Sequence, residues 1–271
     1  MLGLNFPSVM GVLNVTPDSF SDGGRFANKD RALRQARQMI ADGAAILDVG
    51  GESTRPGAAV VSEQRELDRV IPVIEAIRAE SEIPISIDSS KPGVMRAAVA
   101  AGAVLINDVR ALQADGAMAT AVDLQAPVCL MHMQGDPRSM QIKPHYVDVV
   151  AEVTQFLEER VAECVAAGLR RELLLVDPGF GFGKTAAQNV ELLANLRQLQ
   201  RIGCPVLIGI SRKSTLGAIS GRDVDDRMAA SIAAAVFAVL QGAQIIRAHD
   251  VKETVDAIRV AECLAKAGKG Q

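Results

Sequence analysis

The sequence of 271 residues contains no tryptophan, one tyrosine and four cysteines, and each shortage limits what the protein can be. Cys129, Cys164, Cys204 and Cys263 lie apart among apolar residues without a C-x-x-C pair. This pattern predicts free, mostly buried thiols in a reducing compartment such as the cytoplasm. No apolar run reaches about 18 residues, so we expect no membrane span. The N-terminus has neither the charged start nor the cleavage site of a signal peptide.

The sequence also lacks an excess of positive charge. Its formal net charge is −3 and its pI is about 5.7, which argues against a broad nucleic-acid surface but leaves room for a local anion site. With 49% hydrophobic and 23% charged residues, the chain can bury a large core and is not of disordered composition.

Short apolar stretches rich in valine and isoleucine alternate with longer stretches of helical periodicity. Strands are predicted at 9–15, 45–50, 84–88, 104–109, 127–133, 173–177, 205–211 and 244–250. Helices are predicted at 29–42, 63–80, 92–101, 115–124, 147–167, 187–200, 226–240 and 251–267, and several of them are followed by a glycine-containing turn. Continuously apolar strands are typical of parallel sheets covered on both faces. This alternation, with no linker, predicts one closed (β/α)8 barrel, a TIM barrel, as a single domain over 1–271; an open doubly wound sheet is the alternative.

Every predicted strand ends in a polar or ionisable residue, whereas the strand starts carry nothing comparable. The residues are Asn14, Asp48, Asp88, Asn107, His132, Asp177, Lys213 after Ser211 and Arg212, and Arg247 with His249. In a barrel of this type the active site lies at the carboxyl ends of the strands. Helix capping explains one or two such residues but not the whole set.

Asp88 and Asp177 end apolar strands, where an unpaired carboxylate is costly. Each is expected to meet a cation or to accept hydrogen bonds from a ligand; a cap or a salt bridge to a neighbouring strand is the alternative. Asp108 points away from Asn107 by strand alternation and is expected to be structural.

Arg247 and His249 lie two residues apart on one strand, so their side chains project to the same face and can both donate to an anion. The alternative is an arginine paired with a nearby carboxylate. The other two histidines, His132 and His145, are not assigned to chemistry; His132 fits a satisfied core histidine.

Lys213 lies where the seventh strand meets its helix. It can form a Schiff base or donate to a carbonyl oxygen, and the sequence does not choose between these. Ser214 is expected near a helix N-terminus, as an anion contact or a plain N-cap. The glycine-rich segments 14–30 and 50–63 are interpreted as lids over this rim, and Thr54 and Arg55 in the second favour an anion-binding role.

The stretch DPGFGFGKT, residues 177–185, resembles a phosphate-binding loop but fails its spacing. A P-loop needs a glycine five residues before the Gly-Lys-Thr glycine, and Pro178 stands there before Gly183. The weaker dinucleotide pattern lacks its acidic partner about 20 residues later. We expect Lys184 to be solvated or to mark a helix start.

Taken together, the segments resemble the dihydropteroate synthase family of folate biosynthesis. MGVLNVTPDSFSDGG (10–24), DVGGESTRPG (48–57), LMHMQGDPRSMQ (130–141), DPGFGFGKT (177–185), GISRKSTLG (209–217) and IRAHDV (246–251) follow one another in the order found in that family. The family joins p-aminobenzoate to a dihydropterin carrying a methyl diphosphate, releasing diphosphate and 7,8-dihydropteroate.

The resemblance implies a set of residue roles. Asn14 would bind Mg²⁺ with the diphosphate. Thr54, Arg247 and His249 would hold the diphosphate. The pterin would contact Asp88, Asn107, Met131, Asp177 and Lys213. The p-aminobenzoate site would use Arg55, Pro56, Phe182 and Ser214, so the catalytic assignment is Arg247, His249, Lys213 and Asp88. The resemblance also implies a cytoplasmic homodimer with small-molecule substrates and neither nucleic acid nor membrane as a partner.

Four positions depart from the family pattern. They are Ser89-Ser90 for the usual Thr-Tyr, Ala248 for valine, and Thr215 for an apolar residue. None removes an assigned polar group. Two alternative functions would use the same pterin pocket. One is a corrinoid-linked methyltransferase and the other is a non-catalytic pterin-binding barrel. Both have less need of the diphosphate donors.

Overall fold

The computed structural model describes residues 3–16, 25–53, 58–136 and 139–267. Its strands form a single sheet in the order β6-β5-β4-β3-β2-β1-β8-β7, and each neighbouring pair is parallel. The strands are β1 (Ser8–Asn14), β2 (Ile46–Gly50), β3 (Ile85–Asp88), β4 (Leu105–Asp108), β5 (Val128–Met131), β6 (Leu174–Asp177), β7 (Leu207–Gly209) and β8 (Ile245–Ala248).

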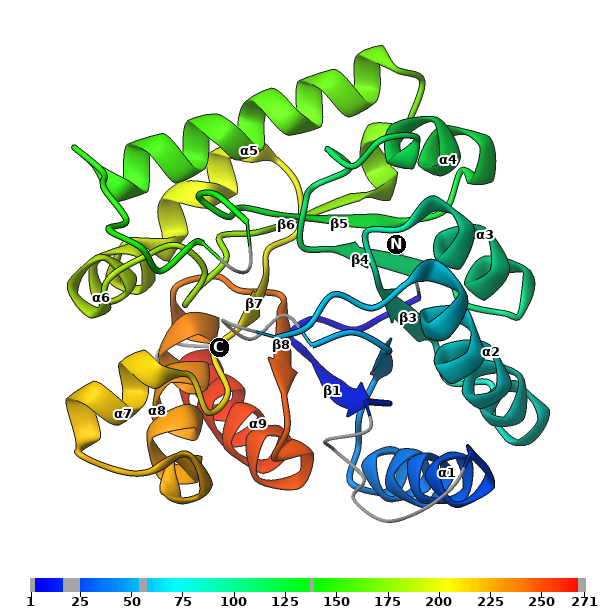
Figure 1. Cartoon of the computed structure of the whole chain (residues 1–271). Helices are drawn as coiled ribbons and strands as arrows, with labels where there is room; N and C mark the ends of the chain where they lie inside the picture. The colour runs from blue at the N-terminus through cyan, green and yellow to red at the C-terminus, as the bar shows by residue number, and fades with distance from the viewer. Residues whose placement is uncertain (1–2, 17–24, 54–57, 137–138, 268–271) are drawn as a thin grey trace.

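The two ends of this sheet meet through a parallel bridge between Val176 and Val206. The amide of Val176 also donates to the carbonyl of Pro205 at 3.0 Å. The sheet is thus closed into a barrel, with the strands at the centre and the helices around them (Figure 1). The predicted (β/α)8 barrel is confirmed, and the open doubly wound sheet is excluded.

The helices lie close to their predicted positions. They are α1 (Arg25–Ala41), α2 (Glu63–Glu80), α3 (Pro92–Ala100), α4 (Ala117–Leu124), α5 (Val149–Ala166), α6 (Ala186–Ala194), α7 (Ser214–Ser220), α8 (Met228–Leu240) and α9 (Val251–Ala267). The predicted helix 187–200 is divided, because α6 ends at Ala194 and a 3-10 helix covers Leu196–Ile202. Helix α7 was not predicted as a separate element, since seven residues are too few to show helical periodicity.

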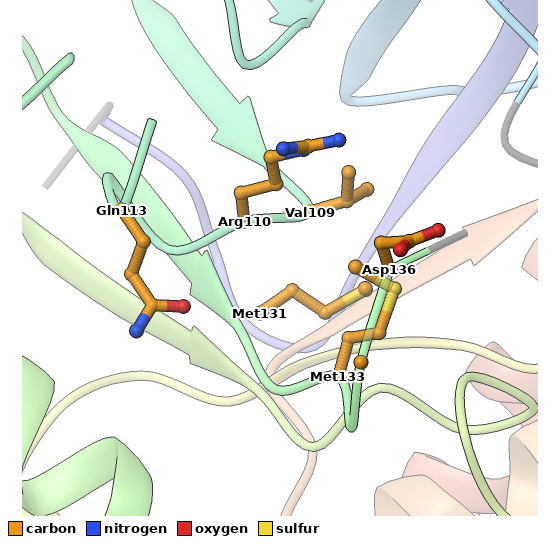
Figure 2. A pocket seen from close by; sticks show the side chains of 7 residues that line it. Val109, Arg110, Gln113, Met131, Met133 and Asp136 are labelled. Atoms are coloured by element: carbon orange, nitrogen blue, oxygen red, sulfur yellow. The ribbon is translucent and has the colours of Figure 1, made fainter. Parts of the chain in front are cut away.

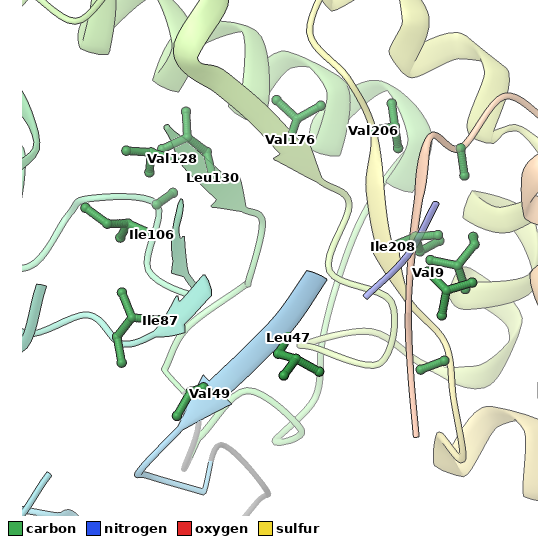
Figure 3. Packing of buried hydrophobic residues seen from close by; sticks show 14 of the residues in the cluster. Val9, Leu47, Val49, Ile87, Ile106, Val128, Leu130, Val176, Val206 and Ile208 are labelled. Carbon is green, nitrogen blue, oxygen red and sulfur yellow. The ribbon is translucent and has the colours of Figure 1, made fainter. Parts of the chain in front are cut away.

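Buried side chains form two layers that follow the alternation of the strands. One set, including Leu47, Ile87 and Val176, packs between the sheet and the helices (Figure 3). The other set contains no helix residue and takes one residue from each of seven strands: Met10, Ile46, Leu105, Cys129, Leu175, Leu207 and Ile245. This second set fills the inside of the barrel and forms the floor on which the polar residues of the carboxyl rim stand.

Other expectations from the sequence are also met. The predicted turn glycines after the helices adopt positive φ angles, at Gly43, Gly102, Gly168, Gly203 and Gly242. All four cysteines are free, and only Cys263 is exposed. Within the described part of the chain, no helix combines the length and apolarity needed to cross a membrane.

Candidate active site

The polar residues of the rim stand one step above the apolar floor. Side chains two residues apart on a strand share a face, so residues two positions after the floor residues Ile46, Leu105, Leu175 and Ile245 also point inward. Those residues are Asp48, Asn107, Asp177 and Arg247, and Asp88 holds the same place on β3 by pairing with Asn107 on β4. Strand register therefore gathers the predicted polar residues into one cluster at one end of the barrel.

The guanidinium of Arg247 joins two carboxylates at the centre of this cluster. Its Nε donates to Asp48 Oδ2 at 2.6 Å, and its Nη2 donates to Asp88 Oδ2 at 2.9 Å. Asn107 Nδ2 donates to the same oxygen of Asp48 at 3.1 Å. The expectation that Asp88 meets a cation is confirmed, and Arg247 adopts the paired arrangement that was the alternative to an anion contact. Asp48 was noted at the end of β2 without a role, and its place here becomes visible only in three dimensions.

Burial dominates the electrostatics of Asp88. It raises the pKa of the Asp88 carboxyl to about 7, against the lowering effect of the Arg247 guanidinium and with a further rise from Asp48. Asp88 therefore holds its proton to a higher pH than a solvated aspartate does. A carboxyl group of this kind accepts a hydrogen bond from a polar ring when it is ionised and donates one when it is protonated.

Asp177 is buried in the same rim and accepts a hydrogen bond at 2.7 Å from the amide of Gly179. Burial raises the pKa of Asp177 to about 6, although the Gly179 amide and the charge of Lys213 lower it. The second carboxylate oxygen of Asp177 therefore offers an acceptor in a region of low dielectric, where it is worth more than in water.

His249 follows β8 and is held by Ser211, after β7. Its backbone amide and its ring Nδ1 each lie 3.1 Å from Ser211 Oγ. Burial, with the charge of Arg247, lowers the pKa of His249 to about 4. The ring is therefore neutral at physiological pH, and an anion bound beside it favours its protonation.

Lys213 packs on the loop that follows β6. Its Nζ lies 4.0 Å from the centroid of the Phe182 ring, a cation–π contact. A Cβ placed on Gly181 would lie 3.1 Å from Lys213 Cδ, so the lysine stem crosses this glycine closely. Ser214 is the first residue of α7 and is exposed, which confirms its expected place at a helix N-terminus.

A pocket with both apolar and polar lining residues adjoins the polar cluster at the ends of β4 and β5. Met131 and Met133 lie on one side of it and Val109 and Arg110 on the other (Figure 2). Met131, with Val109, Met140 and Phe182, also forms a small cluster of buried apolar side chains. A flat, mostly apolar ring with polar edges fits this combination of thioethers and carboxylates.

Lys184 lies just before Thr185, the N-cap of α6, as one of its two sequence-based alternatives predicted. The other alternative, a solvated side chain, is wrong, because Lys184 is only 3% exposed. Its Nζ lies 2.9 Å from His132 Nδ1 and 3.0 Å from each of the carbonyls of Gly179 and Phe182. The prediction failed because a lysine after glycines is usually solvated, whereas here the glycines turn the chain inward. His132 is a satisfied buried histidine, as expected.

Asp108 has the structural role expected of it. It points away from the cluster and accepts hydrogen bonds from the amides of Arg110 and Leu112, at 2.9 and 2.8 Å. It also contacts the hydroxyl of Ser90, one of the positions that depart from the family pattern.

Asn14 ends β1 beside Gly50, and the missing side chain of this glycine leaves a small space. A Cβ placed on Gly50 would lie 3.6 Å from Asp88 Oδ2 and 3.7 Å from Asn14 Oδ1. Hard oxygen donors around a small space fit Mg²⁺, which usually takes one or two protein ligands and completes its shell with water and phosphate oxygens. The described residues include no cluster of three or more His, Cys, Asp or Glu side chains able to hold a metal alone.

Thr54, Arg55 and Pro56 lie outside the described residues. The segments on either side of them are tied to the barrel. Glu52 accepts a hydrogen bond from the amide of Val61 at 3.0 Å and pairs with Lys91. Lys91 also pairs with the buried Glu66.

Comparison with known proteins supplies independent information. The sequence matches the family described as "Pterin binding enzyme" over residues 10–249. It is 53% identical over 266 residues to the dihydropteroate synthase of Haemophilus influenzae, with 98% of this chain and 97% of the relative covered. The dihydropteroate synthase of Escherichia coli K12 is also 53% identical over 266 residues, with 98% and 94% covered.

The chain is also similar to solved structures of dihydropteroate synthases. The Yersinia pestis dihydropteroate synthase in a sulfonamide drug complex has a TM-score of 0.92 and 51% identity, covering 96% of this chain and 95% of that one. The Xanthomonas albilineans enzyme with 4-aminobenzoic acid has a TM-score of 0.92 and 51% identity, covering 96% and 94%. The Xanthomonas albilineans enzyme with 7,8-dihydropteroate has a TM-score of 0.89 and 48% identity, covering 98% and 95%.

Proposed function

The chain belongs to the pterin-binding enzymes, among the dihydropteroate synthases, and from this premise we propose how its own residues carry out the reaction. The reaction is an alkyl transfer that joins a dihydropterin methyl diphosphate to p-aminobenzoate and releases diphosphate and 7,8-dihydropteroate. The cluster at the carboxyl rim has to bind a flat polar ring, hold an anion that gains charge, and admit an aromatic amine.

The pterin binds between the buried carboxylates and the pocket at the ends of β4 and β5. Asp88, Asn107 and Asp177 face the ring edge with acceptors and an amide, and Met131 covers a ring face. The Lys213 ammonium donates to a ring carbonyl, which is the simpler of its two sequence-based alternatives, because a Schiff base has no place in this reaction. The buried carboxylates lack water as a hydrogen-bond donor. Pterin N–H groups donate to them instead, and these new hydrogen bonds favour binding.

The diphosphate leaves toward Arg247, His249 and Thr54. As the methylene C–O bond breaks, its electron pair goes to the diphosphate oxygen, and fixed donors at that place lower the barrier. Asp48 and Asp88 orient the guanidinium before substrate arrives. The same carboxylates favour the positive charge that spreads from the methylene into the pterin.

Asn14 Oδ1 would hold Mg²⁺ together with the diphosphate. When bound, this ion supplies charge that stabilises the departing diphosphate. Support for the assignment comes from the position of Asn14 at the end of β1, where its Oδ1 and Asp88 Oδ2 both lie near Gly50.

The amine enters from the side of Phe182 and Ser214, with Arg55 and Pro56 completing the p-aminobenzoate site. Its nitrogen lone pair forms the new bond to the methylene, and the nitrogen then loses a proton. A neutral aniline is already a nucleophile, so the reaction needs no strong base. The exposed hydroxyl of Ser214 and the N-terminus of α7 suit the carboxylate of p-aminobenzoate.

The observation that carries this proposal is the pair of buried carboxylates bridged by Arg247 above an apolar floor. The test is to supply purified protein with dihydropterin methyl diphosphate and p-aminobenzoate, with and without Mg²⁺, and to measure diphosphate and dihydropteroate. Formation of both products is expected. Binding of pterin without turnover would indicate a non-catalytic barrel, and methyl transfer dependent on a corrinoid would indicate the other alternative.

We also propose a cytoplasmic homodimer built from a single domain over 1–271. Four free thiols suit a reducing compartment. Large apolar side chains are exposed on the adjacent helices α7, α8 and α9: Ile219, Met228, Phe237, Leu240, Val260 and Leu264. A second copy of the chain would cover them. Light scattering during size-exclusion chromatography tests this, with twice the mass of 28.6 kDa expected.

A further inference from the structure

The loop after β6, residues 178–183, carries Phe182 and turns sharply against the loop after β5. Gly179 has a φ of 67°, and a Cβ there would lie 1.8 Å from the carbonyl oxygen of His132. Gly183 has a φ of 61°, and a Cβ there would lie 2.7 Å from the carbonyl oxygen of Gln134. Only glycine permits this approach of two backbones, so the loop fits its place closely.

The backbone polar groups of this loop are bonded from several sides. Gly181 donates to Asn189 Oδ1 at 2.7 Å and accepts from Gln141 Nε2 at 2.9 Å. The carbonyl of Gly183 accepts from the Tyr146 hydroxyl at 2.8 Å. The loop is thus held by the chain's own side chains before any ligand binds.

The side chain of Lys184 binds the backbone of this loop at two places. An ammonium group has three N–H donors and no acceptor, and Lys184 has three acceptors within 3.0 Å: His132 Nδ1 and the carbonyls of Gly179 and Phe182. An ammonium that donates to all three requires His132 Nδ1 to be an unprotonated acceptor. Burial lowers the pKa of Lys184 to about 7, while the charge of Asp177 favours the ammonium form.

The loop in turn positions Lys213. The stem of that lysine crosses Gly181, and its ammonium lies over the Phe182 ring. Asn189 reinforces the same arrangement by donating to Thr215 Oγ1 at 3.1 Å, which joins the loop to α7. Thr215 is one of the departures from the family pattern, and its hydroxyl supplies a bond that an apolar residue lacks.

We propose that Lys184 is a positioning residue for the p-aminobenzoate half of the site: its buried ammonium joins the Gly179 and Phe182 carbonyls to His132 and thereby fixes the Phe182 ring against Lys213. The proposal rests on the assignment of Phe182 to the p-aminobenzoate site. Lys184 itself touches neither substrate. Of the residues assigned to the pterin, Asp88 and Asn107 make no bond to Lys184, whereas Asp177 and Lys213 adjoin the loop that Lys184 holds.

The test uses Lys184→Met, which keeps the length of the side chain and removes its donors. We expect the KM for p-aminobenzoate to rise roughly fivefold to tenfold, the loss expected for about one hydrogen bond of positioning. The Kd of a dihydropterin should rise by a smaller factor, because Asp88 and Asn107 keep their places and only Lys213 and Asp177 adjoin the loop. Lys252→Met, at an exposed position on α9, is the matched control and should change neither value.

A second readout does not depend on activity. The chain has no tryptophan and one tyrosine, and that tyrosine, Tyr146, bonds the loop at Gly183. Tyrosine emission of the ligand-free protein therefore reports on this loop alone. Lys184→Met should change its intensity and lifetime, and Lys252→Met should not.

Removal of three buried hydrogen bonds can prevent folding, so Lys184→Gln is made in parallel. Its amide retains two N–H donors, and an intermediate KM for p-aminobenzoate is expected, with circular dichroism confirming the fold. An unchanged KM for p-aminobenzoate in the folded variants, or an equal rise for both substrates, would overturn the proposal. An inactive wild-type protein would instead overturn the proposed function, and the positioning role would fall with it.

Discussion

Nε of Arg247, on β8, donates to Oδ2 of the fully buried Asp48, on β2, across 2.6 Å. The two residues are 199 positions apart in the sequence. This bond fixes the guanidinium at the centre of the rim, and the second bond to Asp88 fixes its plane. A guanidinium held in this way can meet a developing charge without rearranging, which is the condition for electrostatic catalysis.

The first prediction concerns this guanidinium. Arg247→Lys keeps a positive charge but cannot bridge Asp48 and Asp88, so we expect kcat to fall by roughly two to three orders of magnitude. The KM for p-aminobenzoate should change far less. Steady-state kinetics measures both, and Arg259→Lys, at an exposed position on α9, serves as the control. Wild-type turnover in Arg247→Lys would remove the proposed anion site. Arg247→Ala is a poorer choice because it leaves Asp48 buried without its partner, at a cost of about 3–5 kcal/mol.

The second prediction concerns Asp177. Asparagine at this position keeps the acceptor for the Gly179 amide and removes the charge. Calorimetric titration should show much weaker pterin binding by Asp177→Asn, and unchanged affinity would contradict the assigned role.

The same variant should be more stable than the wild type without ligand. Burial raises the pKa of Asp177 from 3.8 to about 6, so the folded state binds the proton more tightly than the unfolded state. The wild type therefore loses stability as pH rises through this window, by at most roughly 3 kcal/mol. Thermal unfolding at pH 7.5 should show a Tm higher by a few degrees in Asp177→Asn. This gain in Tm should vanish near pH 4. An equal gain in Tm at both pH values would show that the charge of Asp177 is not its cause.

The third prediction concerns His249. Burial and Arg247 lower its pKa to about 4, and a bound anion must raise it, because it favours the protonated ring. The chain has only three histidines, so each imidazole can be followed separately by NMR. On addition of diphosphate, the titration of His249 should move toward neutral pH and that of His132 should not move. By linkage, diphosphate should bind more tightly as pH falls into this range. An unmoved His249 would place the diphosphate elsewhere.

The fourth prediction concerns the metal. Chelation of divalent ions should abolish most of the activity, and Mg²⁺ should restore it. Asn14→Ala should raise the Mg²⁺ concentration required for half-maximal rate roughly tenfold. Asn14→Asp keeps an oxygen ligand and should restore part of the affinity. Equal Mg²⁺ dependence in all three proteins would show that Asn14 is not a ligand.

The sequence predicted most of the fold because parallel barrel strands are apolar on both sides and their helices are periodic. The predicted strands differ from β1–β8 mainly at the ends, where a strand continues as a loop of the same composition. Helix α7 was not predicted because it is too short to show the periodicity of apolar residues that marks a helix. The polar residues that end the strands were identified correctly, since the barrel brings all carboxyl ends to one rim whatever the loops do.

The sequence by itself determined the barrel, the rim at which its polar side chains gather, and the types of residue found there. Only the tertiary structure decided which of them contact one another. Asp48 and Arg247 are distant in sequence and meet through the closure of the sheet. Lys184 is buried because the glycines before it turn toward the loop after β5. Local patterns set the direction of a side chain along its own strand, whereas its partner depends on strand register and loop packing, which no single segment encodes.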